Sequence, residues 1–380
     1  MTVSTFLKKV WFKLRGGVLT LYPDDKEVRG RVLLSHETVG FFRPDSDPLS
    51  AHPNYWGAKQ IARTFLDRGY VVDVIRYDNH SFLPKKKYNY AIDVDENLGR
   101  FGKLLGADCV KIFHILAAHW LFQNTAEYKR CLDLQKRRGV TVYPRRTVRP
   151  SLSIENADIG AHFGNEFTRG TYEYAGKKLV PIPAPLTHTY PSPVAKNIDR
   201  ARKNFVWFGG AGAVHKGLDL TLEAFVGMPD YNLTICGKVG DEDFLTAYKK
   251  ELSLPNITLK GWVDAGGAEF EKIRNESLGL VFPSCSEGAG QSGLVATHAG
   301  LIPIVSFETG ISVNDFGVLL KESSVEAIRE AVLTVSNLPE KELRARILAG
   351  WAYMQKYHSR EAFAESWATL VDELEAKHRQ

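Results

Sequence analysis

Short apolar runs alternate with longer amphipathic stretches along most of the chain. In the first half, runs of Val, Ile, Leu and aromatic residues predict strands, and apolar residues spaced three and four positions apart predict helices. The predicted strands are 31–36, 71–77, 90–94, 109–115, 140–146 and 157–164, and the predicted helices are 55–69, 98–105 and 126–138. This alternation is typical of a parallel sheet with helices on its faces.

The alternation resumes after a proline-rich segment, 181–200, whose five prolines predict a linker. Beyond it, the predicted strands are 204–210, 231–236, 256–261, 278–282, 302–306 and 316–320, and the predicted helices are 218–225, 292–299, 325–335 and 359–378. We therefore expect an α/β protein of two Rossmann-like domains that face a central cleft. The expected divisions are 1–190, a linker at 191–203, 204–357, and a C-terminal helix at 358–380 that returns to the first domain.

Length and composition agree with two domains. The chain has 380 residues, and single cores usually stop growing below about 300 residues. The net charge of +5 does not argue for a nucleic-acid partner, and it suits an anionic small ligand. The four cysteines lack the spacing of metal ligands, which predicts reduced thiols in a cytoplasmic protein.

The beginning of the chain has a basic amphipathic pattern. On a helix over 5–15, Phe6, Val10 and Trp11 share one face, while Lys8 and Lys9 lie largely off it. Such a helix fits the surface of an anionic membrane, and the alternative is a helix packed on the protein itself. No run approaches the roughly 18 apolar residues that a membrane span needs. Any membrane contact is therefore expected to be peripheral, at the inner face.

The segment 282–306 carries the strongest functional signal. A short apolar strand ends at Phe282, a carboxylate follows at Glu287, and Gly288, Gly290 and a small-residue helix come next. A strand, a glycine loop and a helix start together present backbone amides and a helix dipole to an anion. Glu287 stands about five residues ahead of the predicted helix, too early to cap it well, and this position favours a functional role.

A second signal lies in GGAGAVHKGLDLTLEAF (209–225), a glycine turn followed by a helix start. Lys216 stands directly ahead of that helix. Its charge, the helix dipole and the backbone amides near Gly209 and Gly210 can together neutralise a diphosphate. The alternative for Lys216 is a solvated lysine without a role.

These two segments, the second of them SEGAGQSGLVATHAGLIPIVS (286–306), resemble the retaining glycosyltransferases of family 4, also called group 1, which have the GT-B fold. The resemblance covers about 204–335 and is only architectural before that. It implies transfer of a sugar from a nucleoside diphosphate sugar to a hydroxyl of a saccharide, a lipid-linked glycan or another acceptor. It further implies retention of the anomeric configuration, without a metal ion or other cofactor.

The resemblance also implies roles for individual residues. Glu287 would contact the transferred sugar and steady positive charge at its anomeric carbon. His114, near the end of a predicted strand, would lie close to the donor sugar and the acceptor, and the alternative is a buried histidine without chemistry. Gly288 and Gly290 would let the backbone approach the sugar and the phosphate. The implied donor-binding residues are Gly209, Gly210, Lys216, Gly288, Ala289, Gly290, Gln291 and Ser292.

An acceptor pocket is expected on the first domain. The candidate residues are His52, Tyr55, Trp56 and His119. Tyr55 or Trp56 can stack on a sugar ring, although aromatic residues that open a helix more often pack in a core.

Two positions depart from the family pattern. Val295 stands where the family has a second glutamate, which binds the ribose hydroxyls, and Ala211 stands where it tends to have an arginine for the phosphates. His215, Thr297 and His298 are candidate replacements, and the sequence does not distinguish among them. A clamp of backbone amides is a further alternative.

Two other functions fit the same sequence. One is a nucleotide-sugar 2-epimerase with the same fold, which would isomerise its own donor. The other is a non-catalytic relative that binds a nucleotide or a glycan. The departures from the family pattern at Val295 and Ala211 favour this interpretation, and the presence of Glu287 and Lys216 argues against it.

Overall fold

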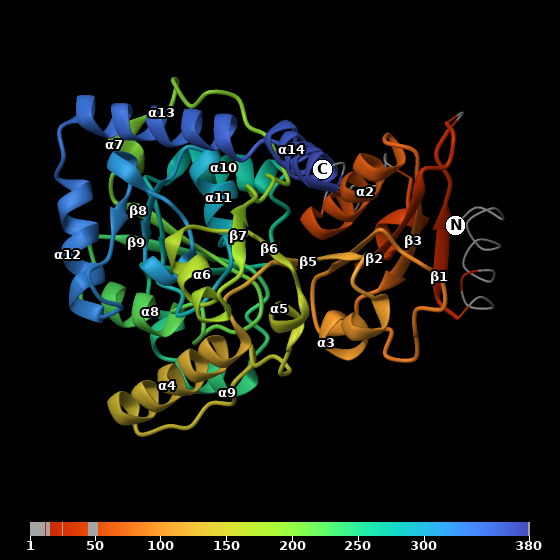
Figure 1. The fold of residues 1–380 in the computed structure, drawn as a ribbon. Helices are drawn as coiled ribbons and strands as arrows, with labels where there is room; N and C mark the ends of the chain where they lie inside the picture. The colour runs from red at the N-terminus through yellow and green to blue at the C-terminus, as the bar shows by residue number, and fades with distance from the viewer. Residues whose placement is uncertain (1–11, 13–15, 25, 45–51, 379–380) are drawn as a thin grey trace.

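The computed structural model describes residues 12, 16–24, 26–44 and 52–378. Within this part of the chain, seven strands form a first sheet in the order β1-β3-β2-β4-β5-β6-β7 (Figure 1). Neighbouring strands are parallel except β1, which runs antiparallel to β3. The strands are β1 (Val18–Leu21), β2 (Gly30–His36), β3 (Tyr70–Arg76), β4 (Tyr90–Asp93), β5 (Val110–Ile115), β6 (Ile159–His162) and β7 (Lys178–Pro181).

Helices connect these strands, as the alternating pattern predicts. They are α2 (Pro53–Leu66), α3 (Asn97–Phe101), α4 (Trp120–Arg138), α5 (Ser153–Asn156) and α6 (Glu166–Gly170). Helix α2 buries Ile61 and Phe65 in one cluster with Val32 and Val72 of the sheet. The apolar face of the helix and the apolar strand residues therefore form one core.

A second sheet follows, and its six strands among the described residues are all joined in parallel, in the order β10-β9-β8-β11-β12-β13. The predicted pair of parallel α/β sheets is thus confirmed. The strands are β8 (Asn204–Phe208), β9 (Asn232–Cys236), β10 (Ile257–Gly261), β11 (Gly279–Phe282), β12 (Ile302–Val305) and β13 (Val318–Leu319). The helices are α7 (Ile198–Ala201), α8 (Leu218–Val226), α9 (Glu242–Ala247), α10 (Ala268–Glu276), α11 (Gln291–His298), α12 (Val325–Ser336), α13 (Glu340–Tyr357) and α14 (Arg360–His378).

Helix α14 lies against α2 of the first half (Figure 1). Arg68, just after α2, forms a salt bridge of 2.7 Å with Asp372, and the rings of Trp56 and Phe363 lie 5.5 Å apart. The end of the chain therefore packs on the first sheet's helices.

Helix α4 belongs to the first half by sequence but lies alongside α8 and α9 of the second (Figure 1). Arg137 pairs with Asp219 of α8 at 2.6 Å, and Arg138 pairs with Glu251 at 2.6 Å. Leu134 is buried in the same apolar cluster as the strands of the second sheet. Helix α4 is thereby fixed to the second half.

The two halves meet closely at Gly288. A Cβ at this position would lie 1.9 Å from the carbonyl oxygen of Leu116, which follows β5. The Gly288 carbonyl oxygen faces Gly164 and Gly310, and a Cβ at either of these would lie 1.9 Å from it. Thr168 Oγ1 donates a hydrogen bond to the same oxygen at 2.8 Å. Only glycine fits this contact without displacing main-chain atoms.

Some predicted elements are wrong. Residues 140–146 form no strand, because their amides are bound by side chains: Asp243 accepts from the Tyr143 N–H, and Glu127 accepts from those of Arg145 and Arg146. Pro144 has no N–H to donate. The prediction also starts α4 six residues late. It omits β1, β7, α10 and α13, and the short helices α5, α6, α7 and α9.

The predicted membrane-contacting segment, 5–15, lies outside the described residues apart from Phe12. The Phe12 ring packs edge-on against Phe42 at 5.2 Å. In the described part of the chain, no helix combines the length and the apolar character needed to cross a membrane.

Candidate active site

Two loops at the carboxyl edge of the second sheet bring Lys216 and Glu287 together. The turn after β8 carries Lys216, and the loop after β11 carries Glu287. Lys216 Nζ donates to Glu287 Oε1, and Ser284 Oγ donates to the same oxygen at 3.0 Å. The two charged side chains are only 10% and 13% exposed. The sequence-predicted pair is therefore a largely buried ion pair.

The Glu287 carboxylate is held in its ionised form. Burial alone would raise its pKa, but the charges of Lys216 and His215 and the hydrogen bond from Lys216 outweigh burial and lower it. Lys216 also lies over the face of the Phe282 ring, 5.3 Å from its centre. The site thus presents a fixed negative charge directly beside a fixed positive one.

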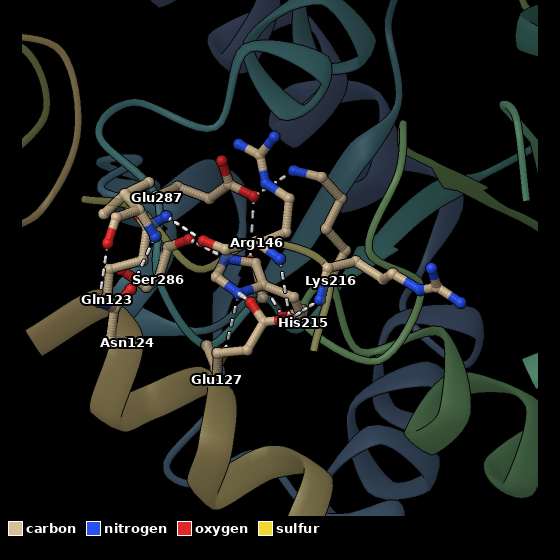
Figure 2. A network of polar contacts seen from close by, with 12 residues as sticks. Gln123, Asn124, Glu127, Arg146, His215, Lys216, Ser286 and Glu287 are labelled. Atoms are coloured by element: carbon tan, nitrogen blue, oxygen red, sulfur yellow. Dashed lines mark hydrogen bonds and ion pairs between the residues drawn. The ribbon is translucent and has the colours of Figure 1, made fainter. Parts of the chain in front are cut away.

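His215 adds a second positive charge (Figure 2). Its Nδ1 lies 2.6 Å from Glu127 Oε2, and its Nε2 lies 2.6 Å from the carbonyl oxygen of Ser286. A carbonyl oxygen only accepts, and an ionised carboxylate only accepts, so both ring nitrogens must carry a proton. Burial lowers the pKa of His215, but hydrogen bonds with Cys285 and Glu127 raise it to about 9.

Glu127 links this network to the first half of the chain. It lies on α4, with its side chain 2% exposed. Burial would raise its pKa, and the hydrogen bond and charge of His215 hold the pKa below its ordinary value. Its other oxygen, Oε1, accepts from the Arg145 and Arg146 amides at 2.6 and 3.0 Å. A carboxylate with these three partners fixes α4, the 145–146 backbone and His215 relative to one another.

Sequence reasoning missed Glu127, although a signal was available. Gln123, Glu127, Arg130 and Leu134 are the buried residues of α4, and they recur at the spacing of one helix face. Three polar residues on a buried face indicate fixed partners, and Arg130 supplies one by donating to the Pro283 carbonyl at 3.1 Å.

The comparisons with known proteins agree with this geometry. Residues 194–348 match the model of the family described as glycosyl transferases group 1. This part of the chain is a group 1 glycosyl transferase domain. No curated protein matches the sequence.

Solved structures extend the likeness to the whole fold. A sucrose-phosphate synthase from Thermosynechococcus elongatus is 15% identical, with a TM-score of 0.64 over 92% of this chain and 100% of that chain. Anabaena HepE, solved with UDP and glucose, is 11% identical, with a TM-score of 0.57 over 92% and 100%. The pneumococcal O-GlcNAc transferase GtfA, solved with UDP and GlcNAc, is 16% identical, with a TM-score of 0.51 over 75% of this chain and 56% of that chain. The chain has the GT-B fold.

The glycines of the glycosyl transferase domain make close contacts within the protein itself, and their predicted approach to a donor stays a prediction. The space at Gly288 is filled by the Leu116 carbonyl, and a Cβ at Gly290 would lie 2.9 Å from Ile311 Cδ1. The amides of Gly209 and Gly290 donate to Cys236 and Thr309. Gly288 thus lets the protein's own backbone approach, and Gly209 and Gly290 make room for the side chains of Trp207 and Ile311. Only Gly210 of the predicted glycines leaves open space around its missing Cβ.

The other loop residues divide between the core and the rim. Ala289 is buried, and Gln291 and Ser292 are half-buried at the start of α11. Gln291 Nε2 donates to the Pro185 carbonyl of the linker at 3.0 Å. No side chain caps α11 at Gly290, so Ser292 and its neighbours begin a helix whose first amides face the loop.

His114 lies in the core and not at the site. It is 1% exposed, its Nδ1 donates to the Ala161 carbonyl at 3.0 Å, and its ring packs against Trp367 of α14. Burial lowers its pKa to about 4 despite that hydrogen bond. The assignment of His114 to catalysis is corrected: α14 covers the imidazole, which remains neutral and structural.

The predicted acceptor residues do not form one group. His119 caps α4, where its Nδ1 accepts from the Leu121 amide at 3.4 Å, and it lines a cavity of about 160 Å³. His52 caps α2, and its ring packs at a tilt against that of Tyr55. The Trp56 ring packs on Phe363. Of the two alternatives for this ring, sugar stacking and packing within the protein, the structure shows the second.

The departures from the family pattern also have structural outcomes. Val295 is 3% exposed in the apolar cluster around α11. Thr297 Oγ1 donates to the Gly293 carbonyl, and His298 Nδ1 accepts from the Tyr190 amide. Of the three candidate replacements, His215 alone contacts the loop that carries Glu287.

A cavity of about 560 Å³ lies where the chain crosses between the halves, and neither Lys216 nor Glu287 is among its lining residues. The linker, the loop before α10 and the junction of α13 and α14 line it. Its polar side chains are those of Thr187, His188, Thr189, Tyr190, Glu271, Gln355, Ser359, Arg360 and Glu361.

The charge of His215 predicts a pH dependence of stability. Its folded pKa of about 9 lies above its ordinary value of 6.5, so its contribution is complete below pH 6.5 and is lost as the pH rises through 9. That contribution is on the order of 3 kcal/mol. Urea unfolding from pH 6 to 10 should show the loss in the wild type and not in His215→Gln, and parallel curves for the two would contradict it.

Proposed function

We propose that the protein is a retaining glycosyltransferase that transfers a sugar from a nucleoside diphosphate sugar to an acceptor hydroxyl. The observation that carries this proposal is the buried Lys216–Glu287 pair, supported by the His215 imidazolium, at the loop junction of a group 1 domain. The acceptor is a saccharide, a lipid-linked glycan or another hydroxyl compound.

The charges suit the reaction. A nucleoside diphosphate is the leaving group, and its negative charge grows as the bond to the anomeric carbon breaks. The Lys216 ammonium lies where it can neutralise that charge, and the ionised Glu287 can accept hydrogen bonds from sugar hydroxyls and face the positive anomeric carbon. Because the two side chains are adjacent, a sugar phosphate bound there would have its hydroxyls at one and its phosphate at the other.

Fixed protein charges supply the field in this proposal, in place of a divalent ion. Lys216 and His215 both lie close enough to lower the pKa of Glu287, and they are held in a water-poor site where such charges act strongly. Dialysis against a chelator should therefore leave transfer unchanged. The structural relatives solved with UDP and a sugar support the choice of donor class.

Nucleotide binding tests the proposal directly. UDP, GDP, ADP and their sugars are added singly to the wild-type protein in thermal unfolding measurements. A bound nucleotide at a hundred times its dissociation constant stabilises the folded state by about 2.7 kcal/mol, so one base should raise the melting temperature by several degrees.

Three results are informative. A shift with one nucleotide family, followed by transfer to a hydroxyl acceptor, supports the proposal. Interconversion of the donor sugar without an acceptor would replace it with the isomerising function. No shift with any member would leave a non-catalytic protein on the same fold.

A further inference from the structure

The glycine turn after β8 carries a positive charge that comes from another part of the chain. Gly212, the neighbour of Ala211, has a φ of +87°, and a Cβ there would lie 2.4 Å from Cγ of Arg146. The Arg146 side chain thus lies directly on the turn that ends in Lys216. Figure 2 shows it on the same side of the network as Lys216 and Glu287.

We propose that Arg146 is a donor-binding residue whose guanidinium binds the diphosphate, at the position that Ala211 leaves without a charge. The inference deepens the proposed function and rests on it. A guanidinium presents a planar fork of donors that matches two phosphate oxygens, while Lys216 acts on the same group as a point charge.

The backbone of Arg146 is fixed on both sides. Its N–H donates to Glu127 Oε1 at 3.0 Å, and its carbonyl accepts from Gln123 Nε2 at 2.5 Å. Both partners are buried residues of α4. The side chain therefore starts from a defined point and loses less freedom when it binds an anion.

Helix α4, which holds the Arg146 backbone, is itself fixed to the second half of the molecule. Arg137 pairs with Asp219 and Glu223, and Arg130 donates to the Pro283 carbonyl. Arg146 consequently keeps its distance from Lys216 if the two halves open and close.

The guanidinium itself is available. In the described part of the chain, no carboxylate lies within 4.0 Å of it, whereas the adjacent Arg145 pairs with Asp241 at 3.6 Å and with Asp243 at 3.1 Å. Arg146 is exposed, and its charge contributes to lowering the pKa of Glu287, after burial and the effects of Lys216 and His215. Arg145 is therefore paired with carboxylates of the protein, and the Arg146 guanidinium faces the Lys216–Glu287 site.

The test compares Arg146→Gln with Arg145→Gln, which removes the same charge one residue away. Isothermal titration with UDP, or with whichever nucleoside diphosphate the wild type prefers, should show binding weakened at least ten-fold in Arg146→Gln and less than three-fold in Arg145→Gln. Arg146→Lys should recover part of the loss, and the parent nucleoside should bind the wild type and Arg146→Gln equally. Unchanged melting temperatures would show that all variants fold.

The outcomes separate the two proposals. Equal diphosphate binding by Arg146→Gln and Arg145→Gln overturns the role of Arg146 and leaves the proposed function standing. An equal loss for the diphosphate and the nucleoside also overturns it, because the effect would then not lie at the phosphates. A wild-type protein that binds none of the diphosphates removes the proposed function, and this inference with it.

Discussion

Replacing Lys216 with methionine should lower kcat for sugar transfer by about a hundred- to a thousand-fold. This is the usual effect of removing one preorganised charge or donor from a site where negative charge develops. Methionine keeps most of the length and the apolar stem, and it removes the ammonium that lies over the Phe282 ring. Steady-state kinetics with saturating donor and acceptor measure the loss.

The same substitution leaves Glu287 buried without its principal partner. Removing one member of a buried pair typically costs about 3–5 kcal/mol, and the nearby His215 charge should reduce that cost. A loss of activity alone would therefore not separate catalysis from folding. The double variant Lys216→Met/Glu287→Gln does, because it removes both charges and should regain stability.

If the pair acts in transfer, the double variant folds well and remains inactive. If the pair only connects two loops, the double variant regains activity together with stability, and the site assignment fails. Lys250→Ala provides a matched control, since Lys250 is an exposed lysine of the same half. It should retain wild-type kinetics.

The sequence located this pair because both residues follow signals of local chemistry. Lys216 directly precedes a helix start, and Glu287 directly precedes a glycine-rich run, so each stands out within about ten residues of chain. The parallel sheets follow from local periodicity in the same way. The carboxyl ends of parallel strands lie at one edge of the sheet. The loops after β8 and β11, which carry Lys216 and Glu287, are therefore expected to lie together from the strand order alone.

Glu127 and Arg146 could not be located in this way. Their roles depend on α4 crossing to the second half, which is fixed by pairs such as Arg137–Asp219, 82 residues apart in sequence. The pattern of the segment that contains Arg146 predicts a strand. The segment forms none, because three of its amides donate to side chains and not to a neighbouring strand. Long-range ion pairs leave no periodic signal in one sequence.

His114 shows the opposite error. A histidine near the end of a central strand is placed correctly by the pattern, but its exposure depends on what covers it. Trp367 and Phe363 of α14 lie against its ring, more than two hundred residues further along the chain. A strand position therefore predicts the location of a side chain and not its access to substrate.

Replacing Gly288 with alanine should reduce transfer by about a hundred-fold, although the new methyl group does not point at Lys216. Its Cβ would lie 1.9 Å from the Leu116 carbonyl oxygen and 2.9 Å from Ala117 Cα. Both are main-chain atoms and cannot rotate away, so the loop after β11 and the loop after β5 must separate. A displacement near 1 Å of reacting groups can cost about two orders of magnitude in rate, and overpacking typically costs about 1–3 kcal/mol of stability.

This separation should be visible apart from the kinetics. Small-angle scattering should give a larger radius of gyration for Gly288→Ala, and urea unfolding should give a lower free energy. Binding of the preferred nucleoside diphosphate should change little, because Lys216 and Arg146 remain on the second half. Gly170→Ala is the matched control, since a Cβ at Gly170 meets nothing within 4 Å. Wild-type transfer by Gly288→Ala would show that the 116–117 loop yields and that closure at this glycine does not position the reacting groups.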